Sequence, residues 1–210
     1  MALLSRDLLS ADKNKEEKPE KLEALSMAQR LFLFSFHARG MSFVDVAFLK
    51  KSDIHNNILV YRRRKTGQQL EIMVTTEMRR IMDSFQSETK SSPYLFPIIR
   101  KPGKDEYHQY ETGLKRQNRN LKALATHCGL QLASSSSNFK LRTLNFKLTT
   151  HVARHTWASL SNQLNYHLPV YSVAVGHTAA KTTSIDLASI DLRVAGRLNR
   201  WTLDHVINRG

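Results

Sequence analysis

The chain has 210 residues, of which 32 are lysine or arginine and 18 are aspartate or glutamate, giving a formal net charge of +14. A surplus of this size favours a polyanionic partner, with nucleic acid ahead of an anionic membrane surface, and disfavours a basic one. No apolar run approaches the about 20 residues that span a bilayer, no signal peptide is visible, and the single cysteine, Cys128, excludes an internal disulfide and fits a reducing cytoplasm.

Residues 1–21 are predicted to be a linker or the remnant of an upstream region, because residues 11–21 carry mixed charges and no large apolar side chain. The compact domain is expected to span residues 22–210. Residues 22–39 place apolar side chains at helical spacing and predict a helix that stops at Gly40.

The next segments predict a short helix, a hairpin and two longer helices. Ser42 and Asp45 have capping-box spacing and open a helix that runs to about residue 49. Residues 58–63 and 69–74 alternate and are rich in β-branched side chains, which predicts two strands joined by a turn at residues 64–68.

Further along, Thr75 or Thr76 is expected to cap a helix that reaches Phe85. Residues 93–97 are expected to be irregular, and residues 110–128 to form a basic helix.

The remaining segment is also predicted to be helical. A loop at residues 133–138 precedes a helix capped by Thr150, and a short helix from Pro169 stops at Gly176. The rest, to about Val206, is expected to be helical, so the predicted fold class is mainly α with a small antiparallel β-sheet (α+β).

One helix carries residues suited to gripping phosphate. His151 and Arg154 are three residues apart and share a helix face. A histidine and an arginine with this spacing, and no further motif, usually lie on a solvated helix face. Here, however, Gly176-His177 follows, and Asp186 stands nine positions after His177. An arginine fork holds two phosphate oxygens at once, and histidine or lysine can move protons.

This order and spacing resemble the catalytic signature of the tyrosine recombinases, the phage-integrase family, and in particular the Bacteroides-type integrases. The resemblance implies a mostly helical catalytic domain with a small sheet on one side. It implies that Arg154 is the second phosphate-gripping arginine and that His151 and His177 hydrogen-bond the phosphate and assist proton transfer.

The hairpin would then supply the catalytic lysine. Lys65 lies in a Lys-Thr-Gly context at the tip and is expected to protonate the leaving oxygen. The alternative is that Arg62, Arg63, Arg64 and Lys65 form a basic strand end that contacts the DNA backbone. All four are predicted DNA-binding residues.

The first phosphate-gripping arginine does not stand at its family position. Ser42 occupies the place where the family pattern, Gly-Leu-Arg, has arginine. Arg39, one residue before Gly40, could supply the guanidinium instead. The alternative is that Arg39 only complements the dipole at the end of a helix.

The nucleophile is the main departure from the family. The residue nine positions after His177 is tyrosine in the family and Asp186 here. A carboxylate would give a readily hydrolysed acyl phosphate, and its charge would repel DNA phosphate by about 1 kcal/mol at 4 Å even in water. Tyr166 and Tyr171 precede His177 and do not hold the motif position. Two classes therefore stay open: a strand-transferring enzyme changed at its nucleophile, or a non-cleaving DNA-binding or regulatory protein on the same scaffold.

The resemblance also implies the partners. These are duplex DNA and further copies of the chain, assembled on DNA as a tetramer in a bacterial cytoplasm. Residues 191–210 are the candidate exchanged segment, with Trp201, Leu203 and Val206 as its docking face. No metal or nucleotide cofactor is expected. A zinc site at His151 and His155 is disfavoured because the residue after His151 is valine, where the metalloprotease motif needs glutamate.

Overall fold

The structure is a computed structural model that describes residues 19–128 and 148–163. Within these ranges the chain is mainly helical with one small antiparallel sheet, as predicted. The helices are α2 (Pro19–His37), α3 (Phe43–Phe48), α4 (Thr76–Asp83), α5 (Glu106–His127) and α6 (Thr150–Gln163), with a 3₁₀ helix, η2, at Lys51–Asp53. The strands are β1 (Ile54–His55), β2 (Ile58–Arg62) and β3 (Gln69–Met73). Within the described part, no helix has the length and apolar character needed to cross a membrane.

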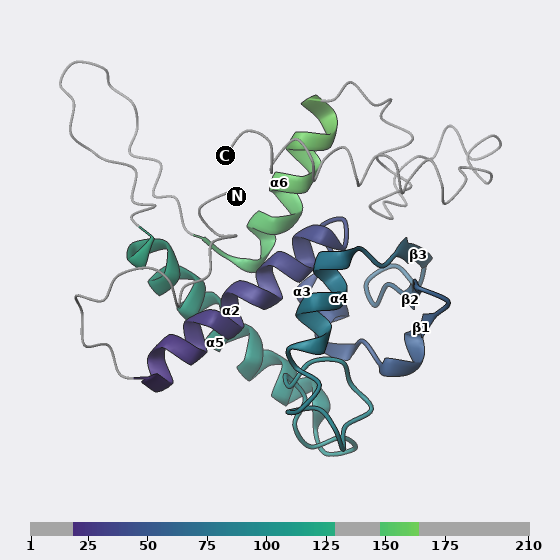
Figure 1. The fold of residues 1–210 in the computed structure, drawn as a ribbon, viewed down its shortest axis with the longest axis horizontal. Coiled ribbons are helices and arrows are strands. Elements are labelled where there is room, and N and C mark those ends of the chain that lie inside the picture. Colours follow the sequence, from purple (N-terminus) through teal and green to yellow (C-terminus); the bar gives the residue numbers. More distant parts are fainter. Residues whose placement is uncertain (1–18, 129–147, 164–210) are drawn as a thin grey trace.

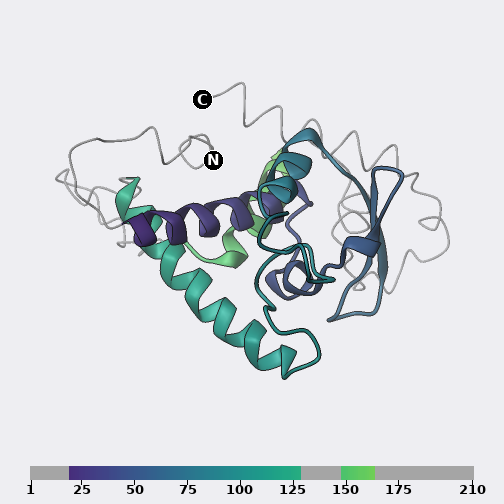
Figure 2. The same cartoon turned by 60° about the horizontal axis from the view of Figure 1, so that its bottom comes forward.

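Helix α2 runs through the middle of the molecule and contacts α3, α4, α5 and α6 (Figures 1 and 2). Because it is covered on several sides, its buried residues do not form one narrow stripe. They are Leu25, Ala28, Gln29, Leu31, Phe32, Phe34, Ser35 and Phe36. The predicted helix is confirmed, although it begins three residues earlier and ends two residues earlier than expected. Of residues 1–21 only the last three are described, and they belong to α2, so the division at residue 21 stays a prediction.

The sheet has the order β1-β2-β3, and both pairings are antiparallel. The predicted hairpin is confirmed, with Tyr61 opposite Leu70 and Arg62 opposite Gln69. Strand β1 was not predicted, because a two-residue strand is too short to show an alternating pattern. The sheet lies to one side of α3 and α4, on the right in Figure 1.

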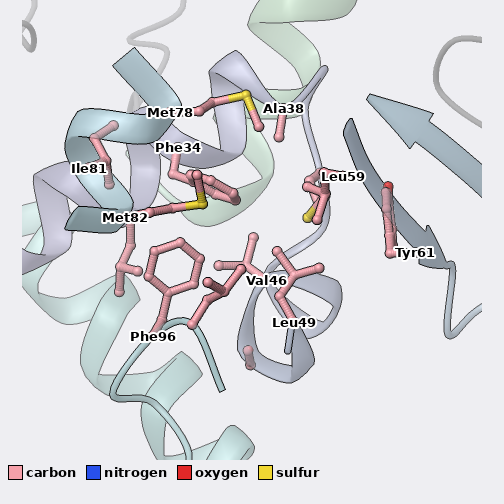
Figure 3. Close-up of a cluster of buried hydrophobic side chains, with 14 of the residues drawn as sticks. Phe34, Ala38, Val46, Leu49, Leu59, Tyr61, Met78, Ile81, Met82 and Phe96 are labelled. Carbon is pink, nitrogen blue, oxygen red and sulfur yellow. The ribbon is translucent and has the colours of Figure 1, made fainter. Parts of the chain in front are cut away.

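Two buried clusters hold these elements together. The first joins α2, α3, α4 and the sheet (Figure 3), and its rings meet edge to face, with Phe34 and Phe96 at 4.7 Å between centroids. The second joins α2, α5 and α6 around Trp157, which is fully buried, together with Phe32 and Leu121. Burial of this tryptophan fixes α6 against α2.

The helix starts agree only partly with the predictions. Thr75 caps α4 and accepts a hydrogen bond from the Met78 amide at 3.2 Å, as expected. Helix α5 begins four residues before the predicted start. The start was missed because the cap, Asp105, stands in a polar stretch that has no apolar periodicity. The prediction that Thr150 caps α6 is wrong: it is the first helical residue, and its amide donates to Asn118 Oδ1 on α5 at 3.0 Å.

The predictions for the remaining segments compare with the structure as follows. The segment at residues 93–97 is irregular, as expected, apart from one isolated bridge between Lys50 and Tyr94. The predicted loop at residues 133–138, and the helices predicted from Pro169 onward, lie outside the described residues.

Candidate functional site

The turn after α2 brings a charged side chain into the interior. The chain leaves the helix through Arg39 and Gly40, whose φ angles are +58° and +67°. The Met41 amide reaches back to the Ser35 carbonyl at 3.0 Å and closes the turn. A non-glycine residue in the left-handed region is uncommon and is often found at functional positions. The backbone strain therefore falls on one of the predicted site residues, Arg39.

The Arg39 guanidinium is buried, with only 4% of the residue exposed. Its Nε and Nη2 atoms have no hydrogen-bond partner among the described residues. Burial lowers the pKa of Arg39 to about 10, an effect opposed by Tyr61, so the group is still charged at neutral pH. A buried cation without hydrogen-bond acceptors is costly unless an anion meets it.

Arg154 reaches the same turn from α6. Its Nη1 donates to the Gly40 carbonyl at 3.1 Å, across 114 positions in the sequence. The approach is so close that a Cβ added to Gly40 would lie 2.6 Å from the Arg154 Cα. The absence of a side chain at Gly40 thus allows α6 to place Arg154 against this turn, at the residue directly after Arg39.

Tyr61, on β2, lies among these arginines. The pKa of Tyr61 is raised above its usual value by burial first and then by Asp45, while Arg63, Arg154 and Arg39 oppose the shift. Three guanidinium groups from three parts of the chain therefore act on one hydroxyl. Ionisation of this hydroxyl is therefore less favourable than that of an exposed tyrosine.

Arg63 is buried as well, at 7% exposed, although it was predicted only as a hairpin DNA contact. The signal for its burial was present in the sequence, because alternation places Leu59, Tyr61 and Arg63 on one side of the strand. The role of Tyr61 as a neighbour of all three arginines was missed, since an aromatic residue in a strand is normally part of the core.

Ser42 and Asp45 do not form the predicted capping box. The Ser42 Oγ donates to Asp45 Oδ2 at 2.5 Å and accepts no bond from the helix backbone. The other carboxylate oxygen of Asp45 accepts from the Arg64 amide at 2.9 Å. The prediction is wrong because Asp45, which is buried, bonds to the hairpin instead of to the start of its own helix.

The hairpin tip carries the remaining basic residues of this region. Lys65 lies in the turn between β2 and β3 and is exposed. Arg62 is exposed and donates to the Gly67 carbonyl at 3.0 Å. Arg64 is exposed too, and its Cζ atom lies 3.5 Å from the centroid of the Phe48 ring.

His151 is exposed on the first turn of α6, with its ring 6.4 Å from that of His155. In the described part of the chain, no group of three or more His, Cys, Asp or Glu side chains is placed to hold a metal ion. His177 and Asp186 lie outside the described residues, as do Tyr166, Tyr171 and residues 191–210. The structure therefore places Arg154 against the turn that carries Arg39, and the two motif positions after residue 163 stay predictions.

Comparisons with known proteins find similarity among solved structures. No protein-family model and no curated protein matches the sequence. Among solved structures, the crystal structure of XerA recombinase is similar, with a TM-score of 0.44 and 16% identity, over 92% of this chain. The match covers 64% of the XerA chain, so this chain spans less than two thirds of that protein's length.

Proposed function

We propose that this chain is the DNA-binding catalytic domain of a site-specific tyrosine recombinase, or of a non-cleaving relative built on the same scaffold. The observation that carries the proposal is the buried Arg39, with two nitrogens that lack hydrogen-bond acceptors, in the turn that Arg154 contacts at Gly40. A DNA phosphate would supply those acceptors, because its non-bridging oxygens match the guanidinium fork. The net charge of +14 would draw duplex DNA to the surface and release its counterions.

The other residues take roles that the sequence motif supports. Lys65, on an exposed turn, would protonate the leaving oxygen, and His151 and His177 would hydrogen-bond the phosphate. Of the basic run on the hairpin, the exposed Arg62 and Lys65 would contact the DNA backbone, whereas Arg63 is buried. A tetramer formed through residues 191–210 belongs to the same proposal.

Replacement of Asp186 by tyrosine separates the two classes within this proposal, the strand-transferring enzyme and the non-cleaving DNA-binding protein. A carboxylate cannot form the phosphotyrosine link, so the chain as written should bind DNA without forming a covalent adduct. If the rest of the catalytic set is intact, Asp186→Tyr should restore cleavage. If the chain is a DNA-binding protein that has lost more than its nucleophile, the substitution should have no effect.

Replacement of Arg39 by methionine tests the binding site directly. The variant removes a buried charge and keeps the length of the side chain, so the free energy of unfolding should stay level or rise. The affinity for a short DNA duplex should fall about 10- to 100-fold, the loss expected for about 1.5–3 kcal/mol of charge-assisted hydrogen bonding. Urea unfolding and fluorescence titration would measure the two effects.

Arg80→Met is the matched control. Arg80 is 68% exposed on α4 and pairs only loosely with Glu77, at 3.8 Å, so the same change of charge should alter both quantities little. If Arg39→Met instead lowers stability and leaves DNA affinity at the control level, Arg39 is a structural residue and the proposed phosphate site is wrong.

Full-length tyrosine recombinases carry a small helical DNA-binding domain before the catalytic domain. The activity arm uses Asp186→Tyr in a chain joined to such a domain, mixed with a nicked duplex that holds the cognate site. A protein–DNA band that survives denaturation would place the chain with the recombinases. Binding without such a band would place it with the non-cleaving class.

A further inference from the structure

Arg64 fastens the tip of the β2–β3 hairpin to α3. The planar guanidinium of Arg64 covers the Phe48 ring at 3.5 Å, which is well inside the range of a cation–π contact. The backbone amide of the same residue donates to Asp45 Oδ1 at 2.9 Å. Side chain and backbone therefore hold this residue to two positions on one helix, three residues apart.

The surface that receives Arg64 is itself fixed. The Phe48 ring lies 6.1 Å from the ring of Tyr110 on α5 and 6.2 Å from that of Tyr94. The carboxylate of Asp45 is buried and also bonded to Ser42. The three rings come from three parts of the chain, and together they give the hairpin a rigid surface to pack against.

The fastened residue stands directly before Lys65. Below the tip, the hairpin is closed by backbone bonds of 2.8 Å from the Arg63 amide to the Gln68 carbonyl and from the Gly67 amide to the Arg63 carbonyl. Without a further contact, the turn residues above this closure would be free to move as an exposed loop. Because one bond to Asp45 comes from the backbone of Arg64, the contact restrains the chain immediately before Lys65.

From this geometry we infer that Arg64 is a positioning residue, which holds the hairpin tip and hence Lys65 in place before DNA binds, and that it is not a phosphate ligand. The inference rests on the proposed function for the role of Lys65. Pre-organisation matters because a proton donor accelerates a reaction only when it is already placed near the leaving atom. Arg64 would therefore contribute to the reaction by holding Lys65 in place.

The order of the tip can be measured on the whole chain without DNA. The steady-state ¹H–¹⁵N NOE of the Lys65, Thr66 and Gly67 amides should match that of β2 and β3 in the unchanged protein. Phe48→Leu and Arg64→Gln should lower it to the level of a flexible loop. Phe48→Tyr, which keeps the aromatic face, should leave the NOE of these amides at the value of the unchanged protein. Amides of α2 serve as the control for global unfolding.

DNA binding separates a positioning role from a phosphate contact. Lys65→Gln should reduce the slope of log affinity against log salt by about 0.9, the value for one lost phosphate contact, and leave the tip ordered. Arg64→Gln should leave that slope unchanged and disorder the tip. The inference is overturned if Arg64→Gln reduces the slope as much as Lys65→Gln does, or if Phe48→Leu leaves the tip amides ordered. If the unchanged protein does not bind duplex DNA, the proposed function fails, while the NOE measurement still decides whether the fastening exists.

Discussion

Replacing Gly40 by alanine should separate α6 from the turn that carries Arg39. An alanine Cβ at this position would lie 2.6 Å from the Arg154 Cα and 3.1 Å from its Cβ and Cγ. The nearest atom is backbone, in a helix anchored by a buried tryptophan, so it cannot rotate away as a side-chain end can. Either α6 or the turn has to shift.

The magnitude follows from two contributions. A side chain at φ +67° costs about 1–2 kcal/mol. Forcing an extra carbon into a closely packed contact costs about 1–3 kcal/mol more. The expected loss in the free energy of unfolding is therefore about 2–5 kcal/mol.

Gly103→Ala is the matched control, because Gly103 has a φ of +77° and no atom within 4 Å of an added Cβ. It should lose only the conformational part, about 1–2 kcal/mol. Urea unfolding of the two variants measures the difference, and a duplex titration should show weaker binding for Gly40→Ala alone. Equal losses of stability in the two variants would refute the close contact between α6 and the turn.

Three further predictions follow from burial and charge. Burial lowers the pKa of His37 from 6.5 to about 4 against a smaller opposing effect of Glu77, so the unfolded chain binds this proton more strongly than the folded one. The free energy of unfolding should hold above pH 6.5 and fall by up to about 3 kcal/mol toward pH 4, and in urea titrations His37→Phe should lack this part of the dependence. Trp157→Ala, in the fully buried contact of α6, should cost about 3–5 kcal/mol in urea unfolding, and a loss below 1 kcal/mol would contradict the packing. Arg154→Ala should weaken duplex binding and reduce its salt dependence at a cost of about 1 kcal/mol in stability; loss of cooperative melting would instead make Arg154 a structural residue.

Much of the fold could be predicted because its signals are local. The hairpin is visible in the alternation around residues 64–68, and α2 and α4 in their helical spacing and in the Thr75 cap. Strand β1 and the start of α5 were missed, since two residues are too few for a period and a cap in a polar stretch has no apolar residue beside it. The charge surplus is a property of composition, and the polyanionic partner that it favours stays a prediction.

The sequence by itself determined the fold class, the basic character, and the motif that nominates His151, Arg154, His177 and Asp186. Only the tertiary structure decided that Arg39 is buried and lies at the turn that Arg154 contacts. It also decided that Asp45 holds the hairpin and not its own helix. The reason is that periodicity reports which face of an element is apolar, whereas these contacts depend on how α6 and the hairpin pack against α2 and α3. That packing joins Gly40 and Arg154, which are 114 positions apart in the sequence. A single glycine that allows such a close approach does not change the apolar periodicity, so the sequence does not reveal the contact.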